Sequence, residues 1–396
     1  MKTPHLITEP SPTARERLAE YRARGGYAGL ARARAEGGRW ALEQVHLAGL
    51  RGRGGSGKGA PVAEKWRKVA RAAGIAKYVI GNGAESSPVS RKDRYLLTYF
   101  PHRVLEGLLI ACAAVGADQA YLFVRGDAEE ALAAVEAALE EAREAGLLGA
   151  VAVELQPSAP SYISGEETAV IDSLEGLEGL PQPKPPYPEE IGLRGCPTVL
   201  NNVETLAAAA AILRLGVEGF RALGTPDCPG TALFTVTGAV GRPGVYEVPY
   251  GTRLDELLAR AGAPAAEQLL AVLPGGLSSG PLRPDELHLP LTYEALAEAG
   301  TSIGPAAIVV FARAEASLSA VVRETVTFLT EASCGQCHGC KEGHRQLAGA
   351  LQAGETGLAR ELATVLLYGR GNCGHPTGTA RLALRALQAF PESDWQ

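Results

Sequence analysis

The sequence predicts an α/β protein in three parts: a layered domain with a parallel sheet, a smaller α+β domain, and a helical C-terminal region. Strand-like and helix-like segments alternate between residues 76 and 155, which favours parallel strand pairing. Short strands separated by turn residues follow from about Thr231. After Glu315 helical periodicity continues to the end of the chain, with cysteines in the intervening loops.

The first part opens with two short amphipathic helices, expected between Thr13 and Ala35 and separated by a Gly-Gly break. Another helix is expected to begin near Ala63. The alternating segments that follow are a strand at 76–82, a helix at 102–115, a strand at 119–125, a helix at 129–145 and a strand at 150–155. Ligands of such sheets bind at the carboxyl ends of the strands, where the polar turn 83–90 follows the first one.

The remaining segments complete the prediction. Residues 165–168 (GEET) start a helix, residues 180–188 form an extended proline-rich boundary or strap, and Asn201 and Asn202 precede an alanine-rich helix. Four strands and one helix at Leu254–Arg260 are expected between 231 and 313. The four C-terminal helices, which fit a bundle, are expected near 316–332, 341–353, 356–368 and 376–389.

Composition limits the function classes. The chain has 396 residues, 46% hydrophobic content and a net charge of −6, so it offers no overall basic field for nucleic acid. No run approaches the roughly 20 apolar residues that span a bilayer. The seven cysteines and the absence of an apolar leader after Met1 predict reduced thiols in the cytoplasm. Membrane association is expected only through a partner, at the cytoplasmic face of a membrane complex.

Four cysteines are grouped in the C-terminal region: Cys334, Cys337 and Cys340, at intervals of three, and the more distant Cys373. Four thiolates are what a cubane iron–sulfur cluster requires, and the even triplet plus one distant thiol favours iron–sulfur. Zinc is the rival, because it accepts mixed Cys and His ligands. The histidines close by in the sequence are His338, His344 and His375.

Two further motifs indicate ligand binding. Residues 49–59, the glycine loop, have glycine at five of the eight positions from Gly52 to Gly59, and the backbone amides with Arg51, Arg53 and Lys58 favour an anion. Glu166 and Glu167 are explained by helix capping, or they line a ribose or flavin pocket.

Seven motifs occur in order along the chain: GLRGRGGSG, NGAESSPVSRKDR, YISGEETAVIDSLEG, KPPYP, NNVETL, TGAVGRPGVYEVP and EASCGQCHGCKEG. Together they resemble the FMN- and NADH-binding flavoprotein subunit of complex I (NADH-quinone oxidoreductase) and its relatives in soluble hydrogenases and formate dehydrogenases. The resemblance runs over nearly the whole chain, which would be a divergent member of this family. It implies a Rossmann-like FMN-binding domain at 1–228 with the N-terminal helices, a ubiquitin-like SLBB domain at 229–314, and a C-terminal four-helix bundle with an iron–sulfur site at 315–396.

The resemblance also implies the function: an oxidoreductase subunit in which NADH or NADPH gives a hydride to FMN, so that no side chain is catalytic, and electrons pass to a [4Fe–4S] cluster. The cluster ligands would be Cys334, Cys337, Cys340 and Cys373. The FMN contacts would be Gly52, Arg53, Gly54, Gly55, Lys65, Asn82, Glu85, Ser86, Tyr162, Gly165, Glu166, Glu167, Asn201 and Asn202. The nucleotide contacts would be Lys58, Lys184 and Tyr187.

Several positions depart from the family pattern. An Asp and a Glu of the family turn are Ala84 and Ser87 here, and two stacking aromatic residues are replaced by Lys58 and Lys68. Each lost stacking pair removes about 0.5–1.5 kcal/mol beyond its buried area. Tyr187 retains the aromatic ring of the KPPYP motif. Either the site prefers NADPH, with a lysine near the extra phosphate, or the nicotinamide site is degenerate.

The remaining cysteines, Cys112, Cys196 and Cys228, are too few for a second four-thiol cluster and are expected to serve packing. Electrons must therefore leave to another chain, by resemblance a small thioredoxin-like [2Fe–2S] subunit or another iron–sulfur subunit. The alternatives are a redox relay without nucleotide turnover, and a structural paralogue with zinc in the four-cysteine site.

Overall fold

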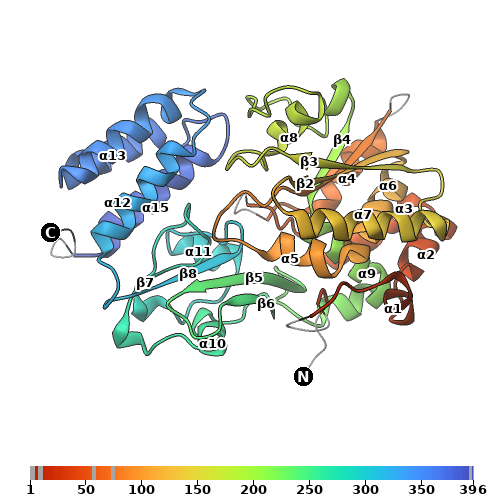
Figure 1. Cartoon of the computed structure of the whole chain (residues 1–396), viewed down its shortest axis with the longest axis horizontal. Helices are drawn as coiled ribbons and strands as arrows, with labels where there is room; N and C mark the ends of the chain where they lie inside the picture. Colours follow the sequence, from red (N-terminus) through yellow and green to blue (C-terminus); the bar gives the residue numbers. More distant parts are fainter. Residues whose placement is uncertain (1–4, 8–11, 56–58, 73–75, 392–394, 396) are drawn as a thin grey trace.

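The protein is described by a computed structural model that covers residues 5–7, 12–55, 59–72, 76–391 and 395. Figure 1 shows three parts: an α/β part, a smaller part built on a second sheet, and a group of helices that carries the C-terminus. The three parts follow one another along the chain, as the sequence predicts.

A parallel sheet of four strands organises the first part. Its strands are β1 (Tyr78–Gly83), β2 (Gln119–Arg125), β3 (Ala152–Ser158) and β4 (Thr198–Asn202), in the order β3-β2-β1-β4. All neighbouring pairs are parallel, which confirms the predicted pairing. In the register Asn82 of β1 lies opposite Asn202 of β4, so the carboxyl ends of these two neighbouring strands coincide.

Alternating side chains cover the two faces of this sheet. Val79 and Val199 belong to a large core shared with the helices, whereas Ile80, Phe123 and Leu200 form a smaller core with α8 on the other face. The helices of this part are α1 (Leu18–Ala23), α2 (Ala28–Glu36), α3 (Gly38–Ala48), α4 (Val62–Arg71), α5 (Lys92–Tyr99), α6 (Pro101–Val115), α7 (Glu129–Glu144), α8 (Glu167–Leu174) and α9 (Val203–Arg221).

Helices α3 and α5 are absent from the sequence prediction. Helix α3 follows α2 directly through Gly37, whose φ of 90° turns the chain, and it begins at a second glycine, Gly38, beyond the predicted helices that end at Ala35. Helix α5 has only eight residues, and its first turn is capped from outside the helix by Glu85. Sequence periodicity is weak evidence for so short a helix.

A second sheet forms the middle part. Its strands are β5 (Thr231–Gly238), β6 (Gly244–Pro249), β7 (Leu269–Leu273) and β8 (Ala307–Ala312), in the order β6-β5-β8-β7. The central pair β5–β8 is parallel and the two outer pairs are antiparallel. Besides the predicted α10 (Leu254–Arg260), this part contains α11 (Tyr293–Glu298), so the prediction of one helix is wrong. Thr292 caps α11 through its hydroxyl.

The C-terminal region is helical, as predicted. Its elements are α12 (Leu318–Glu331), η4 (Gly339–Gly343), α13 (His344–Gln352), α14 (Thr356–Leu362), η5 (Ala363–Leu367) and α15 (His375–Ala389). Both η4 and η5 are π-helical turns, and they pack against each other. Such turns often occur at functional sites. Among the described residues no helix is long and apolar enough to cross a membrane.

The N-terminal residues tie the first two parts together. The backbone amides of His5, Leu6 and Ile7 all donate to the carboxylate of Glu247 in β6. Arg103 of α6 donates to the carbonyl oxygen of Leu6 at 2.8 Å. These contacts hold the second sheet against the helices of the first part.

Candidate functional site: two binding regions that meet at one seam

The glycine loop runs beside the carboxyl end of β4. The amide of Gly52 donates to the carbonyl of Ala60, and the amide of Arg53 donates to the hydroxyl of Thr205 in α9, both at 2.9 Å. These bonds fix the loop where α9 begins. Of the loop, residues 56–58 lie outside the described residues, and Lys58 is one of them.

The backbone at Gly54 and Gly55 of the glycine loop has room beside it among the described residues. A side chain at Gly54 would first meet the Cβ of Asn202 at 3.7 Å, and one at Gly55 would meet only the nitrogen of Pro305 at 4.0 Å, among the described residues. Neither glycine has a positive φ. Because neither conformation nor packing requires glycine here, the bare backbone leaves room for a ligand, as a phosphate cradle needs.

Three asparagines lie at the carboxyl ends of β1 and β4. Asn82 donates to the carbonyl of Gly165 at 2.9 Å. Asn201 accepts from the indole of Trp66 at 2.7 Å. Asn202 caps α9 by accepting from the amide of Glu204. The structure therefore brings the glycine loop, the asparagines and the 165–168 turn to one edge of the sheet, as predicted.

Glu85 has a structural role that the sequence did not reveal. Its carboxylate accepts from the hydroxyl of Ser90 at 2.6 Å and from the amides of Asp93 and Arg94 at 3.0 and 2.8 Å. Both oxygens are thus engaged in capping α5. Ser86 lies beside Gly165, since a Cβ on that glycine would be 3.6 Å from the Ser86 hydroxyl.

Two carboxylates and two ammonium groups form a cluster at the start of α8. Glu166 caps the helix by accepting from the amides of Thr168 and Ala169. Lys184 donates to Glu166 at 2.7 Å and to Glu167 at 2.9 Å. Lys65 of α4 reaches Glu167 at 3.2 Å. The cluster thus connects α4, α8 and the proline-rich strap (residues 180–188).

Electrostatics favour the charged forms of Glu167 and Lys184 in this cluster. Burial alone would raise the pKa of Glu167, but the ammonium groups of Lys65 and Lys184 outweigh it and lower that pKa. Burial would lower the pKa of Lys184, and the two carboxylates reverse this and raise it. A ligand that enters here would contact carboxylate and lysine side chains that already form ion pairs with one another.

A second charge cluster lies beneath the glycine loop. Arg53 pairs with Glu204 at 3.4 Å, and Lys92 pairs with Glu204 at 2.9 Å and with Asp93 at 2.7 Å. All four side chains are at least nine-tenths buried. Burial raises the pKa of the Asp93 carboxyl. Removing one member would leave an uncompensated buried charge, so this cluster fixes the floor of the site.

The positions that depart from the family pattern have different surroundings. Ala84 is fully buried, and its Cβ would lie 3.6 Å from a Cβ on Gly165. Ser87 is buried, and its hydroxyl lacks a hydrogen-bond partner among the described residues. Lys68 is exposed and pairs with Glu189 at 3.2 Å. Tyr187 is 44% exposed at the surface of the strap.

The four grouped cysteines lie within electrostatic range of one another. Burial is the main cause that raises the pKa of Cys340, and the thiols of Cys337, Cys334 and Cys373 add to it. Burial raises the pKa of Cys373 to about 11, again with contributions from neighbouring thiols. Cys340 belongs to the π-helical turn η4, and Cys373 precedes α15. The structure therefore brings together all four predicted ligands.

Within the described residues no group of three or more His, Cys, Asp or Glu side chains is arranged to hold a single metal ion. Zinc needs its sulfur ligands about 2.3 Å from one centre. A cubane cluster presents separate iron atoms to separate thiols, so its ligands are spread more widely. The donor set, four neighbouring thiols of which Cys340 is buried and three are partly exposed, has the chemistry that such a cluster requires.

Two of the three histidines near these cysteines, His344 and His375, are engaged elsewhere. His344 contacts the hydroxyl of Thr379 at 2.8 Å, and His375 contacts the carbonyl of Leu329 at 2.7 Å. Their rings also lie 4.8 Å apart. Of the other three cysteines, Cys112 and Cys228 are buried, in keeping with the packing role predicted for them, and Cys196 is partly exposed.

The 165–168 turn and the strap, which belong to the flavin-binding motifs, lie against the segments that carry the four grouped cysteines. We call this boundary the seam. The side chain of Gln336, between two of the cysteines, donates to the carbonyl of Pro181 in the strap at 3.3 Å. The carboxylate of Glu166 is within electrostatic range of the Cys373 thiol and raises its pKa further. Trp66, Gln336 and Thr205 were not predicted as site residues, because their roles depend on contacts distant in sequence.

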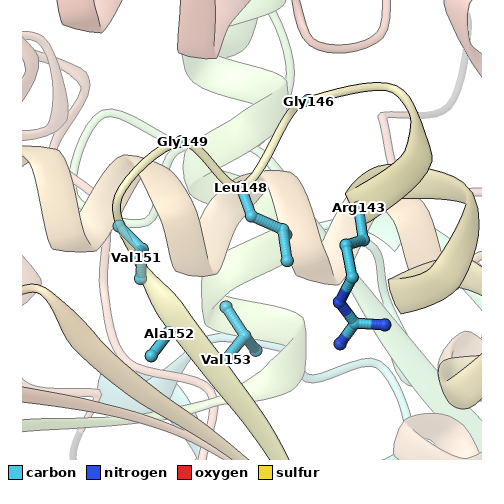
Figure 2. A pocket seen from close by; sticks show the side chains of 7 residues that line it. All are labelled: Arg143, Gly146, Leu148, Gly149, Val151, Ala152 and Val153. Carbon is cyan, nitrogen blue, oxygen red and sulfur yellow. The ribbon is translucent and has the colours of Figure 1, made fainter.

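A surface depression of about 420 Å³ lies away from these motifs. Figure 2 shows it beside Arg143, at the start of β3. It therefore opens at the amino end of a strand, whereas the glycine loop and the asparagines lie at the carboxyl ends of β1 and β4. Since ligands of parallel sheets bind at the carboxyl ends, the motif-lined edge is the better candidate site.

Comparison with known proteins agrees with this assignment. Three family models match: the Nuo51 FMN-binding domain at residues 45–211, the SLBB domain at 233–278, and the NADH-ubiquinone oxidoreductase-F iron-sulfur binding region at 320–393. The first model covers the glycine loop, the asparagines and the Glu166 cluster. The third covers all four grouped cysteines.

Full-length relatives match as well. The F 2 subunit of NADH-quinone oxidoreductase from Rhizobium meliloti is 37% identical, over 94% of this chain and 92% of its own length. The F subunit of NADH-quinone oxidoreductase from Streptomyces coelicolor is 38% identical, over 86% of this chain and 77% of its own. A chain of the crystal structure of an NAD+-reducing [NiFe]-hydrogenase in the H2-reduced state superimposes with a TM-score of 0.86 and 33% identity, covering 98% of this chain and 68% of that one. The chain therefore belongs to the family of NADH-quinone oxidoreductase F subunits.

Proposed function

We propose that this chain is the electron-input subunit of an NADH:acceptor oxidoreductase, which takes electrons from a reduced nicotinamide through FMN and a [4Fe–4S] cluster to a partner chain. The observation that carries the proposal is the seam. Gln336 of the cysteine motif donates to the carbonyl of Pro181 in the strap at 3.3 Å, although the two residues are 155 positions apart in the sequence. Two redox groups held on either side of that seam would be close neighbours.

The residues present fit FMN. The open backbone of Gly54 and Gly55 would accept its phosphate, and the paired cluster of Lys65, Glu166 and Glu167 would face its polar groups. When bound, FMN takes up a hydride as an electron pair and releases the electrons singly, which no protein side chain can do. The FMN contacts we propose are Gly52, Arg53, Gly54, Gly55, Lys65, Asn82, Glu85, Ser86, Tyr162, Gly165, Glu166, Glu167, Asn201 and Asn202.

The chain's own contribution is binding and orientation. The buried cluster of Arg53, Lys92 and Glu204 holds the glycine loop rigid under the ligand. Asn82 locks the 165–168 turn to the end of β1 through Gly165. Because these groups are fixed before a ligand arrives, little ordering is needed on binding.

Cys334, Cys337, Cys340 and Cys373 would hold the cluster. Cys340 is buried and the other three cysteines are partly exposed, and the π-helical turn at Gly339–Gly343 shapes the backbone around the site. Zinc in the same site is the structural-paralogue alternative, which elemental analysis separates from iron.

NADH is the proposed donor, by membership of a family whose relatives are named for it. Tyr187 is exposed on the strap and is free to stack on a nucleotide base. Lys184 is already shared between Glu166 and Glu167, so it is proposed to shape the pocket. An NADPH preference would place Lys58 or Lys68 at the extra phosphate.

The domain limits we propose are 1–228, 229–314 and 315–396. The sheet order β6-β5-β8-β7 with its central parallel pair and α10 supports a ubiquitin-like middle domain. The helices α12 to α15 support a four-helix bundle. The proposed partner is a small thioredoxin-like [2Fe–2S] subunit or another iron–sulfur subunit, in the cytoplasm or at the cytoplasmic face of a membrane complex.

The test begins with the purified protein and counts flavin, iron and zinc. It then adds NADH or NADPH without oxygen and follows flavin absorbance. The proposal expects FMN, iron and acid-labile sulfide, with flavin bleached by NADH. Flavin and iron that neither nucleotide reduces would establish the relay alternative, and zinc without iron the structural one.

A further inference from the structure

Tyr162 lies in the FMN-type motif, yet its ring packs into the C-terminal helical region. It contacts Phe328 of α12 edge-on, with ring centres 5.6 Å apart and planes at 86°. It contacts His375 at the start of α15 in a similar way, at 5.4 Å and 64°. Together with Val89 and Leu277 it packs against the core of the helical region.

The hydroxyl of the same side chain reaches the middle part. It lies 3.3 Å from the hydroxyl of Ser278, just beyond β7. Burial raises the pKa of Tyr162, although the residue as a whole is only partly buried. The side chain of Tyr162 thus contacts all three parts of the molecule. Tyr162 is four residues before Glu166 in the sequence, and its neighbour His375 is two residues after Cys373.

The rest of the seam is held more weakly. Gln336 makes a single neutral hydrogen bond to Pro181 at 3.3 Å. Beside it lies a small hydroxyl-lined pocket of about 110 Å³, between residues 159–180 and Cys334. Because the atoms that line a pocket lack van der Waals partners on one side, the aromatic contact of Tyr162 is the better packed part of the seam.

We propose that Tyr162 is a positioning residue: its ring holds the cysteine-bearing helices against the 161–168 segment and so sets the separation between the flavin site and the cluster site. This inference rests on the proposed function and deepens it. The ring, through Phe328 and His375, carries the effect, and the hydroxyl contributes little. Each electron that leaves the flavin site is gained by the cluster site, so the transfer rate reports their separation.

The experiment compares Tyr162→Ala, Tyr162→Phe and the control Leu358→Ala, which alters a 44%-exposed side chain on α14. In full chains of equal flavin content, flavin is photoreduced by a sacrificial tertiary-amine donor without nucleotide, and cluster reduction is followed by absorbance. Tyr162→Ala is expected to slow cluster reduction several-fold, because the rate of electron transfer falls as the separation between the flavin site and the cluster site increases. Tyr162→Phe restores the wild-type rate, and Leu358→Ala leaves it unchanged. A wild-type rate in the alanine variant, or an equal loss in the phenylalanine variant, overturns the proposal.

A second readout needs no cofactor. Hydrogen exchange of the cofactor-free chain is expected to rise at residues 163–166 and 375–379 in Tyr162→Ala and not in Tyr162→Phe. Unchanged exchange in both segments contradicts the proposal. If Tyr162→Ala does not fold, Phe328→Leu loosens the same contact from the other side and is expected to shift both readouts in the same direction.

The two levels fail separately. A flavin that nucleotides cannot reduce refutes the proposed donor and leaves the photoreduction test of Tyr162 in place. A chain that binds no flavin refutes the proposed function, and hydrogen exchange still decides whether Tyr162 holds the seam.

Discussion

The Nζ atom of Lys184 lies 2.7 Å from one carboxylate oxygen of Glu166, and it also lies 2.9 Å from Glu167. This lysine comes from the proline-rich strap, whereas the carboxylates open α8. One ammonium group therefore holds the strap over the first turn of a helix that the family motif assigns to flavin binding. The strap and the first turn of α8 are therefore joined by these two ion pairs.

Removing that ammonium group should open the pocket. Lys184→Ala leaves two neighbouring carboxylates with only Lys65 to compensate them, so we expect the free energy of unfolding to fall by about 1–2 kcal/mol after allowing for solvent screening. Flavin content should fall with it. Lys68→Ala breaks the exposed pair with Glu189 and is the matched control, expected to change neither quantity. Chemical denaturation and flavin counts check this, and equal losses in the two variants would refute it.

Glycine substitutions separate ligand space from packing. Gly54→Ala adds a methyl group at ordinary contact distance from Asn202, so we expect a stable protein that retains little FMN. Gly107→Ala in α6 would place a methyl group 1.9 Å from the carbonyl oxygen of Leu206, and we expect it to unfold at lower temperature. Thermal unfolding of the flavin-free proteins and their FMN affinities check both. Normal FMN affinity in Gly54→Ala would exclude the glycine loop as the phosphate cradle.

Cysteine substitutions test the metal centre. Cys373→Ser removes one of the four grouped thiols and should cost the protein most of its iron and acid-labile sulfide. Cys196→Ser alters a partly exposed thiol outside the group, and its iron content should equal that of the unmodified protein. Elemental analysis for iron and zinc provides the measurement. Full iron content in Cys373→Ser would remove this residue from the ligand set.

Acid stability should depend on Glu141. Partial burial alone would raise its pKa, but hydrogen bonds from Arg15, the Leu18 amide and His102 outweigh it and lower the pKa from 4.5 to about 2. A carboxyl with a lowered folded-state pKa stabilises the fold above its unfolded pKa. That stability is lost as pH falls from about 4.5 towards 2.

Glu141→Gln should therefore be less stable at neutral pH and show a weaker loss of stability in that acid window. Glu140→Gln, next to it on the exposed face of α7, is the control and should retain the wild-type slope. Denaturant unfolding at a series of pH values measures both. Identical slopes for Glu141→Gln and the wild type would contradict the assignment.

Much of the fold follows from local pattern. The strand at Gln119–Arg125 and the helix at Leu254–Arg260 have the bounds in the structure that the sequence predicts. Asn202 and Glu166 act as helix caps, as the motifs indicate. These features depend on residues within a few positions of one another, so the sequence contains the information.

Other features depend on distant contacts. The capping of α5 by Glu85 crosses a turn, and the burial of Lys92 depends on Glu204, which is far away in sequence. Motif matching places Tyr162 among flavin contacts, and only the packed structure reveals its contact with Phe328. Periodicity carries no signal for such pairs, because neither residue alone predicts its partner.

The central claim is that electrons from NADH reach the four-cysteine site through the flavin site. Rapid mixing of the cofactor-loaded protein with NADH, without oxygen, tests it most directly when flavin absorbance and the paramagnetic signal of a reduced cluster are followed together. The account predicts that flavin bleaches first and the cluster signal follows. A cluster signal that appears without prior flavin reduction, or the absence of both changes, would contradict it.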